Sequence, residues 1–287
     1  MSSAGLQAVG KPAVGRAGHY GPTAFGEDLR RFVNLTVLLA ATDFKLRYFG
    51  SVLGYLWSLV KPLLYFGVLY VVFTVILHVG EGVPHYAVYL LTAIMLWNFF
   101  LETTNGAVPC LVAREGLLRK IRFPRLAIPL AVSLTALFTL CTNFIVVLAF
   151  AIAEGITPEP SWLQLLPLVA LLATLAVGTG MLLSAMFVRF RDIQPIWEVL
   201  TQVLFYGSPI IYVAAKYKGA VHIAMCNPLA AILTQMRHVF VDPSAPSAAV
   251  YIGGAVRLLI PLGIVVGVFG LGLWFFNREA PRIAERL

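Results

Sequence analysis

The sequence predicts an all-α membrane protein with six transmembrane helices, and three observations carry this prediction. The 287-residue chain is 60% hydrophobic and only 12% charged, whereas soluble proteins carry about 25% charged residues. Its apolar residues fall into long runs separated by short polar segments. Its clusters of Lys and Arg lie mostly in segments that six spans would bring to one side of the membrane.

The composition also excludes several classes of function. The formal net charge of +8 indicates membrane topology and contact with anionic lipid, and not nucleic acid, because the basic residues form short clusters between apolar runs. The three cysteines, Cys110, Cys141 and Cys226, are odd in number and far apart, so they predict no disulfide framework. The five histidines show no ligand spacing, so no metal site is expected.

Residues 1–26 are rich in Gly, Ala, Ser and Pro and are predicted to be disordered. The segment has no apolar core of the kind found in a cleaved secretory signal. It does contain a near match to a phosphate-binding loop, from Gly5 to Lys11. Pro12 stands where that loop needs a hydroxyl residue, and neither the preceding strand nor the following helix is expected, so we predict no ATP binding there.

The domain predicted to fold is 27–287, and it opens with an amphipathic helix at 27–48. Apolar residues recur there at helical spacing, namely Leu29, Phe32, Val33, Thr36, Val37 and Ala40. The pattern suits a helix lying at the membrane surface. The alternative is a solvated helix with one side facing the protein core.

The first two predicted spans, about 52–77 and 86–108, each carry an ionisable residue. Lys61 precedes Pro62 in the first, and Glu102 lies in the second. Charge inside a membrane is costly and usually faces protein or water. Lys61 is therefore a candidate site residue, although it could equally reach the headgroups. Glu102 could pair with Lys61 or lie near the cytoplasmic end in contact with water.

The remaining predicted spans are about 126–153, 163–188, 195–212 and 258–276. Between the last two, residues 213–249 are moderately apolar, basic and broken by prolines. A short apolar segment starts at Asn227-Pro228 but is too brief to cross a bilayer. We expect two short re-entrant or interfacial helices there; an ordinary loop is the alternative.

The fifth predicted span ends in Gly207-Ser208-Pro209, a combination that should break or kink a helix. At membrane depth, such a break is tolerated only where other protein or a watery cavity satisfies the freed backbone groups. This helix is therefore expected to face a bundle interior or a pathway. The alternative is a helix that simply ends at Gly207.

Both termini are predicted to be cytoplasmic. The basic clusters at 30–47, 114–125, 189–191 and 278–286 fall on one side of a six-span topology, and the loops at 78–85 and 154–162 contain no Lys or Arg. The basic segment 213–249 lies on the other side and is the one exception to this rule.

Three blocks of the sequence stand out together: Asp43–Tyr48 with Gly54–Pro62, then Arg119–Pro124, then Arg189–Tyr212. These blocks resemble the membrane subunit of ABC-2 type exporters, and most closely its polysaccharide branch, the O-antigen (Wzm-type), capsule and teichoic-acid permeases. The blocks stand in the family's order and together cover most of the chain after residue 30. The resemblance implies that 213–249 lines an outer gate. It also implies that two copies of the chain pair with two copies of an ABC ATPase.

In that reading, the chain itself is not an enzyme and binds no cofactor, because ATP and Mg²⁺ belong to the partner ATPase. Coupling to the ATPase would fall to Arg31, Lys45, Arg47, Arg119, Lys120, Arg191 and Asp192. Aromatic rings suit a path for a sliding sugar polymer because sugars stack on them without fixed charge. The rings expected to line the path are Tyr55, Trp57, Tyr65, Phe66, Phe205 and Tyr206.

The function expected from the sequence is a permease, in the plasma (inner) membrane, for a lipid-linked polysaccharide such as O-antigen, galactan or a teichoic-acid-like polymer. A drug or antibiotic exporter of the same superfamily is the alternative. A membrane-embedded lipid-modifying transferase would need a cluster of polar catalytic residues at one membrane face, and the polar residues here are sparse.

Overall fold

The computed structural model describes residues 29–48, 54–116 and 124–286, and helices are the regular secondary structure throughout these ranges. This confirms the all-α class. A membrane interior offers no hydrogen-bonding partners to the backbone, so long apolar runs fold as helices that satisfy their own N–H and C=O groups.

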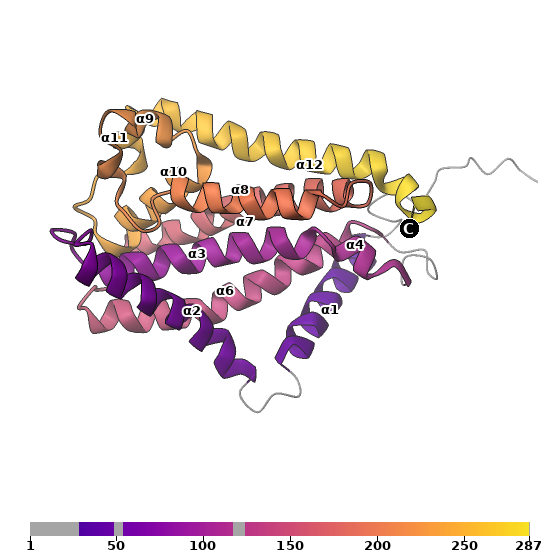
Figure 1. Cartoon of the computed structure of the whole chain (residues 1–287), viewed down its shortest axis with the longest axis horizontal. Coiled ribbons are helices and arrows are strands. Elements are labelled where there is room, and N and C mark those ends of the chain that lie inside the picture. Colours follow the sequence, from indigo (N-terminus) through magenta and orange to yellow (C-terminus); the bar gives the residue numbers. More distant parts are fainter. Residues whose placement is uncertain (1–28, 49–53, 117–123, 287) are drawn as a thin grey trace, which may run out of the picture.

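Within the described ranges, five helical segments are long and apolar enough to cross a membrane (Figure 1). They are α2 (Gly54–Tyr70) with its π-helical continuation η1 (Val71–Ile76), α3 (Tyr86–Ala107), α6 (Ala127–Ala153), η2 (Pro160–Gln164) with α7 (Leu165–Phe187), and η5 (Ala255–Leu258) with α12 (Leu259–Arg286). The predicted spans 52–77, 86–108, 126–153, 163–188 and 258–276 correspond to these five.

The predicted fifth span, 195–212, is observed as a shorter helix. Helix α8 runs over the 15 residues Ile193–Gly207, about 22 Å at 1.5 Å per residue. Ser208 is in extended conformation, so the helix ends at the Gly-Ser-Pro sequence instead of bending through it. A count of six full spans is therefore not confirmed. Even so, α8 lies at membrane depth, because Trp197 and Phe205 pack against Phe100 and Trp97 of α3.

Several short helices follow α8, where two were expected. They are η3 (Ala214–Ala220), α9 (Val221–Ala224), α10 (Pro228–Met236), η4 (Arg237–Val241) and α11 (Ala248–Ile252). Helix α10 begins where the sequence predicted, because the Asn227 side chain accepts a hydrogen bond from the Leu229 N–H at 3.0 Å and Pro228 occupies the first turn.

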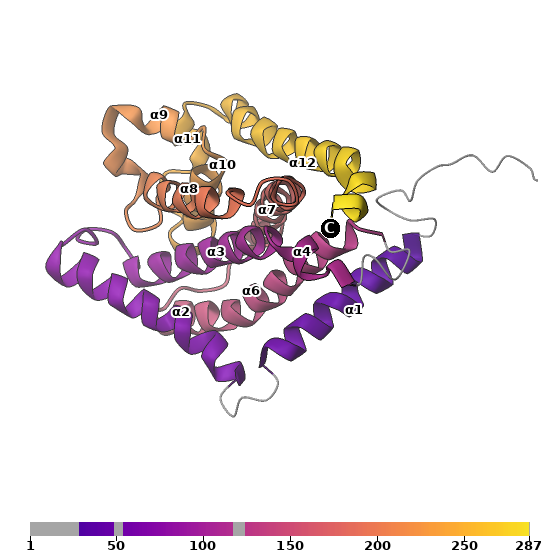
Figure 2. The same ribbon diagram turned by 45° about the vertical axis from the view of Figure 1, so that its right-hand side comes forward.

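Helix α3 is the centre of the bundle. Sixteen of its residues are buried, and 78% of its most apolar window is enclosed, against 6% for α2. Around it pack α6, α7, α2 and α8, and α12 packs on α7. Helices α2 and α12 consequently lie on opposite sides of the α3–α7 pair (Figures 1 and 2).

Helix α1 (Leu29–Tyr48) crosses α6 at the lower right of Figure 1, and its apolar residues divide between two environments. Phe32, Thr36 and Ala40 are buried against the bundle, whereas Val33 and Val37 remain exposed. One stripe of the helix thus packs on the protein, as in the alternative of a helix with one side facing the protein core. The helix also keeps an apolar face free for the membrane surface. The predicted disordered segment, 1–26, lies outside the described residues.

Candidate functional site

The break at the end of α8 is held by tyrosine hydroxyls. Tyr86, at the start of α3, donates to the Ile211 carbonyl at 2.6 Å. Tyr89, one turn later, lies 2.9 Å from the Tyr212 carbonyl and also contacts the Pro209 carbonyl. The backbone groups that the break frees are therefore satisfied by protein, which is the arrangement that a broken helix at membrane depth requires.

A second pair of tyrosines closes the other side of the break. Tyr212 donates to the Tyr206 carbonyl at 2.6 Å, and Tyr217 donates to the Gly207 carbonyl at 2.8 Å. Their hydroxyls lie 3.1 Å apart. Burial, and after it the neighbouring Tyr212 hydroxyl, raise the pKa of the Tyr217 hydroxyl, so it remains a donor at physiological pH. Asn227 adds a hydrogen bond to the Ser208 hydroxyl at 3.1 Å.

The Gly-Ser-Pro sequence predicted the break but not the residues that hold it. Tyr86 and Tyr89 lie in the predicted span 86–108, and Tyr217 lies in the segment 213–249. The available signal was their shared chemistry, because a buried tyrosine normally finds a partner for its hydroxyl.

The predicted path aromatics divide into buried and exposed rings. Phe66 and Phe205 are 8% and 7% exposed and lie inside the protein. Phe205 packs on Trp97, with ring centroids 5.5 Å apart. Trp57, Tyr65 and Tyr206 are exposed at 54%, 42% and 66%. The side chain of Tyr55 lies outside the described residues.

The exposed rings belong to one open face formed by α2 and α8. Tyr65 of α2 lies near Tyr206 of α8, close enough for the two hydroxyls to interact electrostatically. Trp57, Lys61 and Tyr65 are spaced four residues apart along α2 and are all exposed, so they form one stripe.

Helix α8 carries a matching stripe that the sequence analysis missed. Gln194, Glu198, Gln202 and Tyr206 also recur every four residues and are exposed. The Gln194 amide lies 3.3 Å from the Glu198 carboxylate. Polar side chains on the outside of a membrane bundle are costly in lipid, so they indicate water or another protein at this face. The four-residue spacing was the signal that could have found them.

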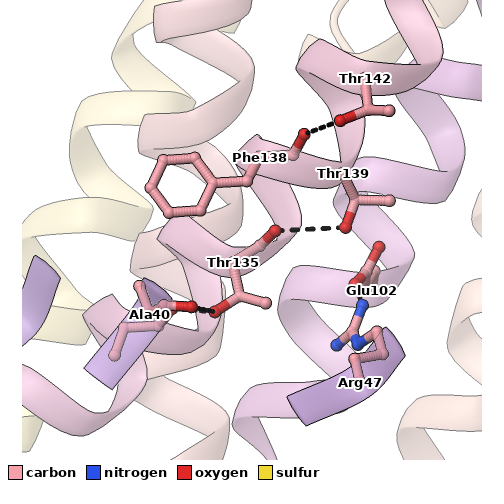
Figure 3. A network of polar contacts seen from close by, with 8 residues as sticks. Ala40, Arg47, Glu102, Thr135, Phe138, Thr139 and Thr142 are labelled. Carbon is pink, nitrogen blue, oxygen red and sulfur yellow. Dashed lines mark hydrogen bonds and ion pairs between the residues drawn. The ribbon is translucent and has the colours of Figure 1, made fainter. Parts of the chain in front are cut away.

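The two intramembrane charges do not pair with each other. Glu102 forms an ion pair with Arg47 near the end of α1 (Figure 3). Lys61 is exposed on α2. Figure 3 also shows Thr135 of α6, which donates to the Ala40 carbonyl at 3.2 Å. Asp43 pairs with Arg114, which follows α4 (Cys110–Ala113). Helix α1 is thus fastened to α3, α6 and the α4 segment.

The other predicted coupling residues are mostly exposed. Arg31 and Lys45 are exposed along α1. Arg191 and Asp192 are exposed in the turn between α7 and α8, with the Arg191 guanidinium 4.9 Å from the Phe187 ring centroid. Arg119 and Lys120 lie outside the described residues. In Figure 1 the α7–α8 turn, α4 and the C-terminal end of α12 share one end of the molecule, and α9 and α11 lie at the other.

Among the described residues, no three His, Cys, Asp or Glu side chains gather in a way that could hold a metal ion. Cys110 is buried beside the helical bundle, and burial raises the pKa of its thiol to about 12. A thiol with that pKa is a poor nucleophile. The open face carries aromatic rings, amides, a carboxylate and the Lys61 ammonium, and these groups can bind a polar solute.

Comparison with known proteins places the chain in a family. Residues 34–241 match the ABC-2 type transporter family. The chain is 31% identical over 260 residues to the O-antigen export system permease protein RfbA of Klebsiella pneumoniae, a match covering 88% of this chain and 95% of that one. It is 27% identical to the protein of the same name from Myxococcus xanthus, over 77% of this chain and 85% of that one. It is 24% identical to the polysialic acid transport protein KpsM of Escherichia coli, over 79% and 87% of the two chains. This chain belongs to the ABC-2 type transporter family.

Proposed function

We propose that this chain is the permease subunit of an ATP-driven exporter that moves a lipid-linked polysaccharide from the cytoplasmic to the outer side of the plasma membrane. The observation that carries the proposal is the similarity, along 88% of the chain, to a permease named for O-antigen export. The relative named for polysialic acid transport supports the same class of cargo.

The open face of α2 and α8 supports a polymer path. Its exposed rings, Trp57, Tyr65 and Tyr206, can stack on sugars, and the amides of Gln194 and Gln202 can bind sugar hydroxyls. In a single copy these groups form only one wall of a path, because none of the described residues covers the exposed face of α2 and α8. Two copies related by a twofold axis would enclose it, which supports a homodimer.

Two copies of an ABC ATPase would supply the energy, since the sequence contains no nucleotide-binding loop of its own. The ATPase would dock at the end of the molecule that carries the α7–α8 turn, with Arg31, Arg191 and Asp192 exposed for contact. In this arrangement that end would face the cytoplasm, and both termini would be cytoplasmic.

The test is purification of the tagged full chain in mild detergent, identification of its partners by mass spectrometry, and an ATPase assay. We expect a stoichiometric ABC ATPase and, in cells depleted of this chain, a glycan attached to lipid that accumulates inside. A chain that purifies alone in several detergents, or depletion that leaves every surface glycan in place, contradicts the proposal.

A further inference from the structure

The end of the molecule farthest from the proposed ATPase dock carries basic residues that the export path does not use. Arg257 lies in η5, where α12 begins, and His222 lies in α9. Both are exposed. His222 lies within the basic segment 213–249, which departs from the charge pattern of the other loops, and Arg257 follows that segment. Arg257 forms no ion pair with any described residue.

Directly beside Arg257 is an apolar groove with a cavity volume of about 190 Å³. Its walls come from α7, α10, α11 and α12, and two of these helices are candidate membrane spans. The lining includes Leu168 and Leu171 of α7, Ile232 of α10, Leu258 at the end of η5, and Leu262 and Val265 of α12. The groove therefore lies at membrane depth and is bounded by helices that face the bilayer.

The lining of the groove has almost no hydrogen-bonding groups for a water molecule. Gln235 is the one lining side chain with hydrogen-bonding groups, and its carboxamide oxygen already accepts from the Ala248 N–H at 3.2 Å. A water molecule needs two to four polar partners to occupy such a space. Hydrocarbon needs none, so the chemistry of the lining selects an acyl chain.

The Arg257 guanidinium lies where the headgroup of a lipid with its acyl chain in the groove would be. Arg257 immediately precedes Leu258, which lines the groove. Its Nη1 atom donates to the Ile252 carbonyl, at the end of α11, at 3.3 Å. A Cβ atom built on Gly253 would lie 2.8 Å from the same Nη1 and 3.5 Å from Cε1 of His222, so the guanidinium and the imidazole meet above this glycine.

We propose that this groove binds an anionic phospholipid of the surrounding bilayer, with an acyl chain between α7 and α12 and the phosphate on Arg257, beside His222. A guanidinium binds phosphate oxygens through two parallel N–H donors, and Arg257 has donors to spare beyond the one on Ile252. The bound lipid bridges α12 to α10 and α11.

The bilayer, and not the cargo, is the source of the lipid because of where the groove lies. It opens beside α12, whereas the proposed polymer path follows α2, on the opposite side of α3 and α7 (Figure 2). The proposal holds whichever substrate the open face carries.

Native mass spectrometry of the full-length protein in detergent tests the proposal, with phosphatidylglycerol and phosphatidylcholine of identical acyl chains as probes. One basic residue near a membrane surface contributes about 1 kcal/mol toward anionic lipid, so the wild type should bind phosphatidylglycerol about fivefold more tightly. Arg257→Gln should abolish this preference. Arg278→Gln, at the other end of the same helix, should keep it.

A second pair of variants tests the groove itself. Leu262→Trp fills the mouth of the groove and should weaken the binding of phosphatidylglycerol at least tenfold. Val266→Trp, one turn along on the exposed side of α12 (61% exposed), adds the same ring outside the groove and should leave binding unchanged. If Leu262→Trp does not fold, a phosphatidylglycerol with a photoreactive acyl chain on the wild type should label 228–235 and 258–265.

Equal affinity for the two lipids, an unchanged preference in Arg257→Gln, or photolabelling confined to other segments would each overturn the proposal. An isoprenoid phosphate that binds tenfold more tightly than phosphatidylglycerol would overturn it as well, and would assign the groove to a carrier lipid.

Discussion

At the scale of single residues, tyrosine hydroxyls satisfy the backbone carbonyls at the end of α8. Ending a helix at membrane depth frees carbonyl groups that would otherwise lack partners. The hydroxyls of four tyrosines lie within hydrogen-bonding distance of five such carbonyls, from Tyr206 to Tyr212, and each hydroxyl donates to one of them at a time. Because an unsatisfied buried acceptor costs more than a satisfied one gains, these hydroxyls should matter more for stability than their aromatic rings alone suggest.

Tyr89→Phe removes a hydroxyl that contacts both Pro209 and Tyr212 while keeping the ring in place. We expect it to lower the free energy of unfolding by about 1–3 kcal/mol, the cost of leaving a buried acceptor unpaired. Thermal unfolding in detergent measures this. Tyr206→Phe is the control, since that side chain is 66% exposed and should tolerate the change. Equal melting temperatures for both variants would contradict the role of the Tyr89 hydroxyl.

The same residues mark the limit of what the sequence could predict at this scale. The break at Gly207–Pro209 was predictable because Gly and Pro act locally. Its partners on α3 were not, because they lie more than 110 residues away in the chain. Likewise, Glu102 was recognisable as a membrane charge, but its choice of Arg47 over Lys61 depends on how α1 crosses the bundle.

At the scale of elements, the tightest packing joins α7 and α12. A Cβ atom on Gly272 would lie 2.2 Å from the Gly178 carbonyl oxygen, and one on Gly178 would lie 2.6 Å from Cα of Phe269. The two backbones touch, with no room for side chains between them. Small residues allow membrane helices to approach in this way, where the lipid itself provides no hydrophobic drive for association.

Gly272→Ala should therefore separate α7 from α12, because the added methyl meets a backbone oxygen that cannot move aside. Overpacking of this kind costs about 1–3 kcal/mol, and we expect that loss in thermal or SDS-induced unfolding. Gly270→Ala, two residues away, has open space around its Cβ position and should be neutral or slightly stabilising. A Gly272→Ala protein as stable as Gly270→Ala would show that the contact is looser than described.

Element boundaries were predictable for α3, α6 and α7 to within two residues, because long apolar runs leave one solution in a bilayer. The prediction was poorer for α8, whose apolar character continues through Ile210 and Ile211 after the helix has ended. Hydropathy predicts which residues leave water and not which are helical, and Ile210 and Ile211 are buried without being helical.

At the scale of the whole molecule, the two sides of the bundle differ. Helices α2, α8 and α12 all expose large apolar side chains, but α2 and the outer face of α8 also expose Lys61 and Glu198, whereas residues 259–276 of α12 contain no charged side chain. Exposed patches that mix apolar and polar groups mark sites of association. Composition predicted a membrane protein but could not predict this asymmetry, which appears only when the helices are assembled around α3.

A second copy of the chain should cover the α2–α8 face. In a chain with Cys110, Cys141 and Cys226 replaced, Val203→Cys should form a disulfide-linked dimer on mild oxidation in membranes, since this α8 residue is 62% exposed on that face. Val266→Cys, 61% exposed on α12, should not. Gel electrophoresis without reductant measures both. Cross-linking through position 266 alone would place the dimer interface on the other side.

The fastening of α1 has a mechanical consequence. Ion pairs to Glu102 and Arg114, and the hydrogen bond from Thr135 to Ala40, hold its C-terminal half, and Phe32, which is 7% exposed, packs its N-terminal half into the core. A helix held along its length moves as one rigid body. A displacement of α1 would therefore reach α3 through Glu102, and α3 is the helix around which α2, α6, α7 and α8 pack.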